Sequence, residues 1–164
     1  KLRTILVYPH AYVAEMVQHV GPARVVSHQP RGGESWSHDY VVLSWDNVKK
    51  GGVDLDDGYN VVLHEFAHQL DQEDGTADGV PILYQRSHYT TWARILSEEY
   101  EQFCEKLRGG EQTVINPYGS VNPAEFFAVL TETFFERPRK LKERHPELYE
   151  ELAAFYKVNP AEWS

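Results

Sequence analysis

His64 and His68 stand four residues apart in the segment HEFAH. On a helix, residues i and i+4 lie on one face, one turn apart, so the two imidazoles can reach a single metal ion. Glu65 lies beside them, where a carboxylate can take a proton from a water at the metal. The segment therefore predicts a zinc site with Glu65 as general base.

Two histidines leave this site short of the three protein ligands that a catalytic zinc usually has. Glu125 and Glu132 are the candidates for the third ligand, and both lie on a later predicted helix. They are about two turns apart and share a face, so spacing does not choose between them. Glu125 also fits a capping box in the segment NPAE. Glu132 also fits a solvated charge or a partner that orients a ligand histidine.

Other titratable residues have weaker claims on the site. Asp71 follows His68 by one helical turn, where it could orient a ligand histidine or simply cap the helix end. His88 and His145 are interpreted as surface or helix-end histidines.

The elements that must position these residues follow from periodicity and turn signals. Runs of β-branched and aromatic residues predict strands at 4–8, 24–27 and 40–45, with a turn at 31–35 and a short helix within 10–20. After residue 52 the pattern becomes helical. Asp56 or Asp57 is expected to cap the helix that carries HEFAH.

Later helices are predicted at 88–107, 122–137 and 145–157, with a loop over 75–81. The paired phenylalanines of the 122–137 helix are expected to pack in the core. A small N-terminal sheet followed by a helical majority predicts one α+β domain over residues 1–164.

Composition and charge narrow the function further. A chain of 164 residues can bury roughly 70% of its unfolded surface in one domain. Its net charge of −9 argues against nucleic acid as a partner. It has neither an apolar stretch of about 20 residues nor a signal-peptide core, which argues against a membrane partner. A single cysteine, Cys104, fits a reducing compartment.

Three segments together resemble the Mlc titration factor A family of zinc peptidases: HEFAHQLD at 64–71, GTADGVP at 75–81 and NPAEFFAVLTETFFERP at 122–138. ILVYP and VVLSWDNV, further upstream, resemble the strands that precede the metal motif in that family. The resemblance runs from about residue 4 to 159. It implies a zincin-like metallopeptidase fold and a cytoplasmic location. Members carry a further N-terminal segment, and this chain begins at Lys1 rather than Met, so a missing segment is expected.

The resemblance also implies site residues. The family's third zinc ligand is the glutamate of its PAE motif, which is Glu125 here and leaves Glu132 as a partner of a ligand histidine. The family, like the similar lethal-factor toxin protease, places a tyrosine seven residues earlier, which is Tyr118 here. A phenol at that place can donate to an oxyanion. The alternative is an aromatic residue that packs on the surface of a turn.

The implied function is aminopeptidase-like hydrolysis of a peptide substrate by one zinc ion per chain. Residues 40–45 are expected to pair with an extended substrate by strand addition. Two alternatives remain. One is a regulatory protein that binds a transcriptional repressor of the Mlc type, with the zinc site secondary. The other is a zinc amidase for a non-peptide substrate.

Overall fold

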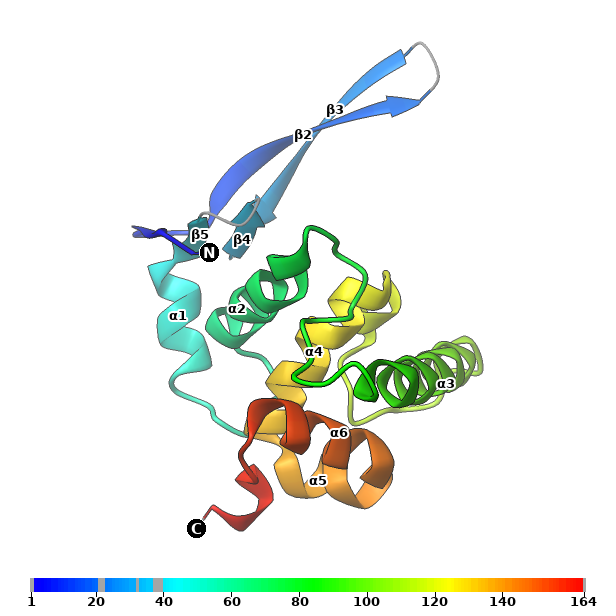
Figure 1. The fold of residues 1–164 in the computed structure, drawn as a ribbon. Coiled ribbons are helices and arrows are strands. Elements are labelled where there is room, and N and C mark those ends of the chain that lie inside the picture. The colour runs from blue at the N-terminus through cyan, green and yellow to red at the C-terminus, as the bar shows by residue number, and fades with distance from the viewer. Residues whose placement is uncertain (1, 21–22, 32, 37–39, 164) are drawn as a thin grey trace.

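The computed structural model describes residues 2–20, 23–31, 33–36 and 40–163, with side chains for 2–11 and 40–163. Within these residues a small β-sheet and a β-hairpin precede a helical body, as Figure 1 shows. The predicted α+β order, with a small sheet first and helices after it, is confirmed.

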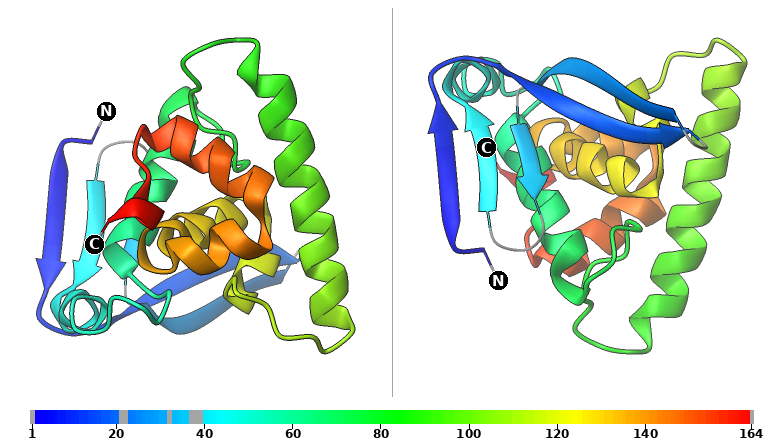
Figure 2. Two further views of the ribbon diagram at one scale, coloured as in Figure 1. Left: turned by 90° about the horizontal axis from the view of Figure 1, so that it is seen from below. Right: turned by 90° about the horizontal axis from the view of Figure 1, so that it is seen from above.

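The sheet has the strand order β1-β5-β4. The central strand β5 (Tyr40–Ser44) is parallel to β1 (Thr4–Tyr8) and antiparallel to β4 (Gly33–Trp36). Val41 and Leu43 of β5 are buried and pack in one cluster with Val61, the first residue of the helix that carries the two histidines. Strand β1 is exposed along its whole length and forms the outer edge in Figure 2.

A long antiparallel hairpin separates β1 from β4. It consists of β2 (Tyr12–Val20) and β3 (Ala23–Arg31), and Figure 1 shows it extending from the sheet away from the helices. The predicted strand at 24–27 is confirmed as part of β3. The predicted short helix within 10–20 is wrong, because ladder pairing with β3 occupies these residues. The turn expected at 31–35 is also wrong at 33–35, which belong to β4.

The segment that leads to the histidine helix differs from the prediction in two places. The strand predicted over 40–45 ends at Ser44, because Trp45 begins α1 (Trp45–Gly51). Helix α2 (Val61–Asp71) is capped by Asn60 rather than by either predicted aspartate. The Asn60 side-chain oxygen accepts from the amides of Val62 at 3.1 Å and Leu63 at 3.2 Å.

Of the two predicted aspartate caps, Asp57 serves the preceding turn through its side chain and Asp56 only through its backbone amide. The Asp57 carboxylate accepts from the Tyr59 amide at 2.8 Å, and the Asp56 amide donates to Asp54 at 3.1 Å. Such local side-chain bonds compete with helix capping, which explains why the helix begins later than predicted.

The remaining helices form the body of the domain. They are α3 (His88–Arg108), α4 (Pro123–Glu136), α5 (Pro138–Arg144) and α6 (Pro146–Tyr156), with 3₁₀ turns η1 (Gln72–Asp74), η2 (Pro117–Ser120) and η3 (Pro160–Glu162). Helices α3, α4 and α6 match their predictions to within one residue at each end. Helix α5 was not predicted. A proline opens each of α4, α5 and α6, where its missing amide costs no hydrogen bond.

Helix α4 lies in the middle of the helical body, with α3 on one side and α5 and α6 on another (Figure 2). Phe126, Phe127 and Phe134 on this helix are almost fully buried, as predicted. They pack against an aromatic cluster that includes Trp92 and Tyr149. Burial on this scale stabilises each side chain by about 1.5–3 kcal/mol, so α4 is held rigidly by the core.

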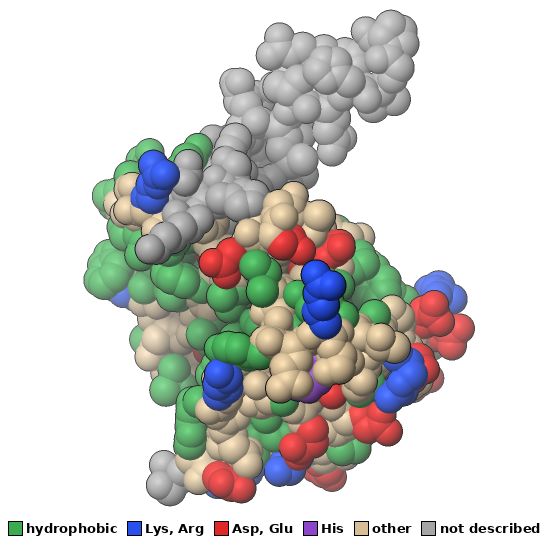
Figure 3. Space-filling model, in the orientation of Figure 1, with side chains coloured by type: hydrophobic (Ala, Val, Ile, Leu, Met, Phe, Trp, Pro, Cys, Tyr) green, Lys and Arg blue, Asp and Glu red, His purple; other side chains and the backbone are tan. Residues whose placement is uncertain are grey.

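In the part of the chain that the structure describes, no helix combines the length and the apolar character needed to cross a bilayer. On the face shown in Figure 3, single Lys and Arg side chains stand among acidic and apolar ones, in keeping with the acidic excess of the sequence.

Candidate metal centre

Helix α2 presents His64 and His68 on one face. Their Nε2 atoms lie 3.2 Å apart, and both rings are mostly buried. The helix is fixed against the rest of the structure because Val61 and Ala67, each three residues from His64, are buried. The i, i+4 spacing thus brings two neutral-nitrogen donors to one point, as the motif predicts.

Helix α4 brings Glu125 to the same point. Its Oε2 atom lies 3.1 Å from His64 Nε2 and 3.3 Å from His68 Nε2. Asn122 caps α4 by accepting from the Glu125 amide at 2.9 Å. Of the predicted capping box, the structure shows only the half made by Asn122. The Glu125 side chain contacts the histidines instead.

This donor set fits a transition metal. Zinc binds histidine nitrogen and carboxylate oxygen at about 2.0–2.2 Å, so the edges of its coordination tetrahedron are about 3.3–3.5 Å. The three distances among His64, His68 and Glu125 are 3.1, 3.2 and 3.3 Å. Among the described residues this is the one cluster of three or more such side chains within reach of a single ion. Two histidines and one carboxylate leave a coordination position open for water or substrate.

Glu132 contacts the other nitrogen of the first histidine. Its Oε1 atom lies 2.7 Å from His64 Nδ1, and its Oε2 atom accepts from the Asn60 amide. The side chain is almost fully buried, which excludes the alternative of a solvated charge. The arrangement is the one in which a carboxylate orients a ligand histidine.

The two carboxylates set the charge of this histidine. Burial opposes a positive imidazole, but the hydrogen bonds that this ring donates to Glu125 and Glu132 raise the pKa of His64 to about 10. Burial likewise opposes ionisation of Glu125, but the two histidines lower the pKa of that carboxyl to about 2. Without a metal, the cluster therefore holds a proton on His64 at neutral pH.

Glu65 and Tyr118 flank the cluster. Glu65 is buried on α2 directly after His64, and its charge helps to raise the pKa of that histidine. Tyr118 belongs to η2, where Asn116 accepts from its amide at 3.0 Å. Its ring is 53% exposed, and its centroid lies 6.0 Å from that of His64. The exposed phenol thus lies beside the histidine and glutamate cluster and is open to solvent.

Asp71 lies fully buried at the end of α2. Burial raises the pKa of its carboxyl above the usual value. The amides of Gly79 and Val80 and the charge of His68 oppose this rise without cancelling it. Within the described residues, neither oxygen makes a hydrogen bond of ordinary geometry. The carboxylate thus faces the 75–81 loop as well as the neighbourhood of His68.

Asn60 is the residue that the motif analysis missed. Besides capping α2, it donates from Nδ2 to Glu136 at 3.0 Å and from its amide to Glu132. Helix-cap preferences could have found it, because an asparagine directly precedes the apolar run of the histidine helix.

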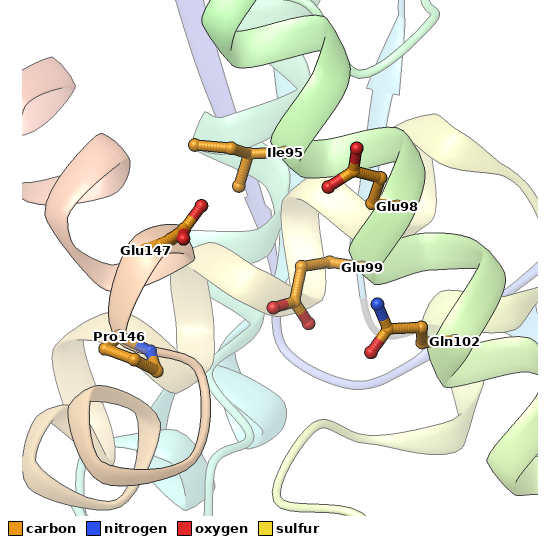
Figure 4. A pocket seen from close by; sticks show the side chains of 6 residues that line it. All are labelled: Ile95, Glu98, Glu99, Gln102, Pro146 and Glu147. Carbon is orange, nitrogen blue, oxygen red and sulfur yellow. The ribbon is translucent and has the colours of Figure 1, made fainter.

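The two spare histidines lie outside this cluster. His88 is exposed, and His145 Nδ1 lies 2.7 Å from Glu99 Oε2. Near His145, a pocket of about 230 Å³ opens between α3 and α6. Figure 4 shows its lining residues: Ile95, Glu98, Glu99, Gln102, Pro146 and Glu147. Arg94 bridges two of these carboxylates, Glu98 at 2.9 Å and Glu147 at 3.3 Å, so its single positive charge balances one of their two negative charges.

The expected pairing of residues 40–45 with a substrate is wrong. Strand β5 lies in the centre of the sheet, and its two edges are already bonded to β1 and β4. Of the strands in this sheet, β4 is the edge strand that lies against α2.

Known proteins are similar to this chain in sequence. The profile of a family described as glucose-regulated metallo-peptidase M90 matches residues 1–157. A Synechocystis protein is 43% identical over 98% of this chain and 59% of its own length. Proteins named Mlc titration factor A, from Pectobacterium atrosepticum and Serratia proteamaculans, are 35% and 34% identical over 95% of this chain and 59% and 60% of their own lengths.

The chain thus spans about three fifths of the length of these relatives. The family match itself covers nearly all of the chain, including both helices of the histidine and glutamate cluster. The chain belongs to the glucose-regulated M90 family of metallopeptidases, in agreement with its resemblance to Mlc titration factor A.

Proposed function

We propose that this chain is a zincin-like peptidase domain that hydrolyses peptide bonds with one zinc ion. The convergence of His64, His68 and Glu125 beside the buried Glu65 carries the proposal. A purely structural zinc site closes all four positions with protein and has no use for a carboxylate beside its ligands. The open position and Glu65 together favour catalysis.

Under this proposal, His64 and His68 hold the zinc through Nε2, and Glu125 holds it through a carboxylate oxygen. Bound zinc would polarise the scissile carbonyl and lower the pKa of a water toward about 7. Glu132 keeps the proton of His64 on Nδ1, so that Nε2 offers its lone pair.

Glu65 takes a proton from the attacking water and delivers it to the departing nitrogen. Its buried position restricts the carboxylate to a few orientations. The Tyr118 hydroxyl donates to the oxyanion that develops on the carbonyl. Its exposure leaves this hydroxyl accessible to substrate.

An extended peptide would pair with the outer edge of β4, which lies against the histidine helix. Main-chain hydrogen bonds of this kind bind a peptide with little demand on its sequence. We propose an aminopeptidase-like preference and a cytoplasmic location on the resemblance to the family alone.

The decisive experiment compares zinc content and hydrolysis of peptide p-nitroanilides in the wild type and two variants. Glu65→Gln is expected to keep stoichiometric zinc and lose about 10²–10⁴-fold in kcat. Glu125→Ala is expected to lose zinc and activity together. Glu73→Gln, an exposed glutamate just after α2, serves as the matched control. Wild-type protein that holds zinc and hydrolyses no peptide would exclude the peptidase.

A second candidate function is binding of a repressor of the Mlc type, with the metal site in a secondary role. The name Mlc titration factor A, carried by relatives at 35% and 34% identity, favours it. The two functions are compatible. Retention of repressor binding in Glu65→Gln, measured by isothermal titration with purified Mlc, would separate binding from catalysis.

A further inference from the structure

The 75–81 loop contacts the start of α4 at a glycine, Gly79, whose backbone approaches that of Pro123. Gly79 is buried and has φ +81°, and a Cβ atom there would lie 2.6 Å from the Pro123 carbonyl oxygen and 3.0 Å from its carbon. Both contacts are with main-chain atoms, which cannot rotate aside. Only glycine allows this approach, and Pro123 precedes Glu125 by two residues.

Two other residues of the helical body lie next to the same glycine, and one of them donates a hydrogen bond to it. The Trp92 indole donates to the Gly79 carbonyl at 3.2 Å in a buried hydrogen bond. Asp71, three residues after His68, lies with its carboxylate toward the amides of Gly79 and Val80. The loop therefore connects the end of the histidine helix with the first turn of the glutamate helix.

We infer that Gly79 is a positioning residue for the metal centre, setting the separation of α2 and α4 at which Glu125 meets His64 and His68. The inference rests on the proposed metal site. A site must hold its groups to within about 0.5 Å of the working geometry. A side chain at residue 79 would push the first turn of α4 outward and carry Glu125 with it.

Gly75 provides a matched control in the same loop. It also has a left-handed φ, of +100°, but nothing lies within 4 Å of the place where its Cβ would be. An alanine at either position meets the strain of a positive φ, whereas only Gly79→Ala meets the Pro123 backbone. The difference between the two variants isolates the contact with α4.

The test measures zinc affinity by chelator competition and the visible spectrum of the Co²⁺-loaded protein. Gly79→Ala is expected to weaken zinc binding about tenfold or more and to change the Co²⁺ spectrum, as disturbed supports of metal ligands do. Gly75→Ala is expected to stay within about twofold of the wild type and to keep its spectrum. Equal zinc affinity and equal spectra in the two variants would overturn the inference.

Circular dichroism shows whether Gly79→Ala folds. If it does not fold, the Trp92→Phe variant tests the positioning role in its place. It removes the donor to Gly79 and keeps an aromatic ring. Phe155→Leu is its control, since Phe155 packs on Trp92 in the same cluster. A loss of about threefold or more in zinc affinity for Trp92→Phe alone supports the inference. Equal affinities in these two variants contradict it.

The readout also separates this inference from the proposed function. A wild type that binds zinc without peptide hydrolysis defeats the peptidase, yet the comparison of Gly79→Ala with Gly75→Ala still tests the positioning role. A wild type that takes up no metal defeats both together.

Discussion

Glu132 Oε1 lies 2.7 Å from Nδ1 of His64, the ring nitrogen that faces away from Glu125. One buried helix, α4, therefore contacts both nitrogens of the same imidazole through glutamates seven residues apart. The Glu125 contact belongs to the donor cluster. Under the proposed function, the Glu132 contact fixes the tautomer that leaves Nε2 free to bind zinc.

Glu132→Gln is expected to weaken zinc binding by about tenfold, because a neutral amide polarises His64 less than a carboxylate does. Glu125→Ala is expected to weaken it more than Glu132→Ala. Chelator competition measures both effects. Glu136→Gln is the matched control: this buried glutamate lies one turn further along α4 and contacts Asn60 instead of a histidine. A larger loss in Glu132→Ala than in Glu125→Ala would reverse our assignment of the ligand.

Tyr118→Phe is expected to lower kcat by about 10²-fold with zinc content unchanged, because one oxyanion donor is removed. The rate of p-nitroaniline release from a peptide p-nitroanilide at saturating substrate measures kcat. Tyr100→Phe controls for disturbance of η2, since the Tyr100 hydroxyl donates to the Ser120 carbonyl there. Equal kcat in Tyr118→Phe and the wild type would assign Tyr118 to the surface.

Zinc affinity is expected to rise with pH between about 6.5 and 10. In the metal-free protein the pKa of His64 is raised to about 10, so below that pH zinc must displace a proton from this ring. One displaced proton corresponds to about tenfold in affinity per pH unit. Competition titrations at pH 7, 8 and 9 measure the slope. A pH-independent affinity over this range would show that His64 is already neutral.

Asn60→Ala is expected to lower the free energy of unfolding by about 1–2 kcal/mol, because the cap of α2 is lost. The loss should exceed that in Asn60→Ser, which keeps a cap oxygen but not the amide that donates to Glu136. Urea unfolding of the metal-free protein measures both. A larger loss in Asn60→Ser than in Asn60→Ala would contradict the capping role.

Structural features that depend on local sequence signals, such as helix faces and helix starts, were predicted well. The pattern around His64 and His68 placed both on one helix face, and Asn122 with Pro123 marked the start of α4 to within one residue. These features follow from periodicity and capping, which act within a few residues of the chain.

Features that depend on contacts distant in sequence were not predictable in this way. The β2–β3 hairpin depends on pairing across 19 sequence positions at its far end, where Tyr12 lies opposite Arg31 in a register beginning at Val20 and Ala23. Glu125 and Glu132 share a helix face, so only the orientation of α4 against α2 separates their contacts. Periodicity along one helix carries no information about that orientation.

Helix α4 is buried on nearly every side, from Ala124 through Phe134. Almost every position on it supports either the core or the donor cluster, so few substitutions on α4 are free of a stability penalty. Divergence in substrate preference among such chains is therefore expected to accumulate in η2 and the exposed connecting loops. The donor cluster would stay constant together with the core that holds it, whereas substrate selectivity would change through substitutions at the surrounding surface.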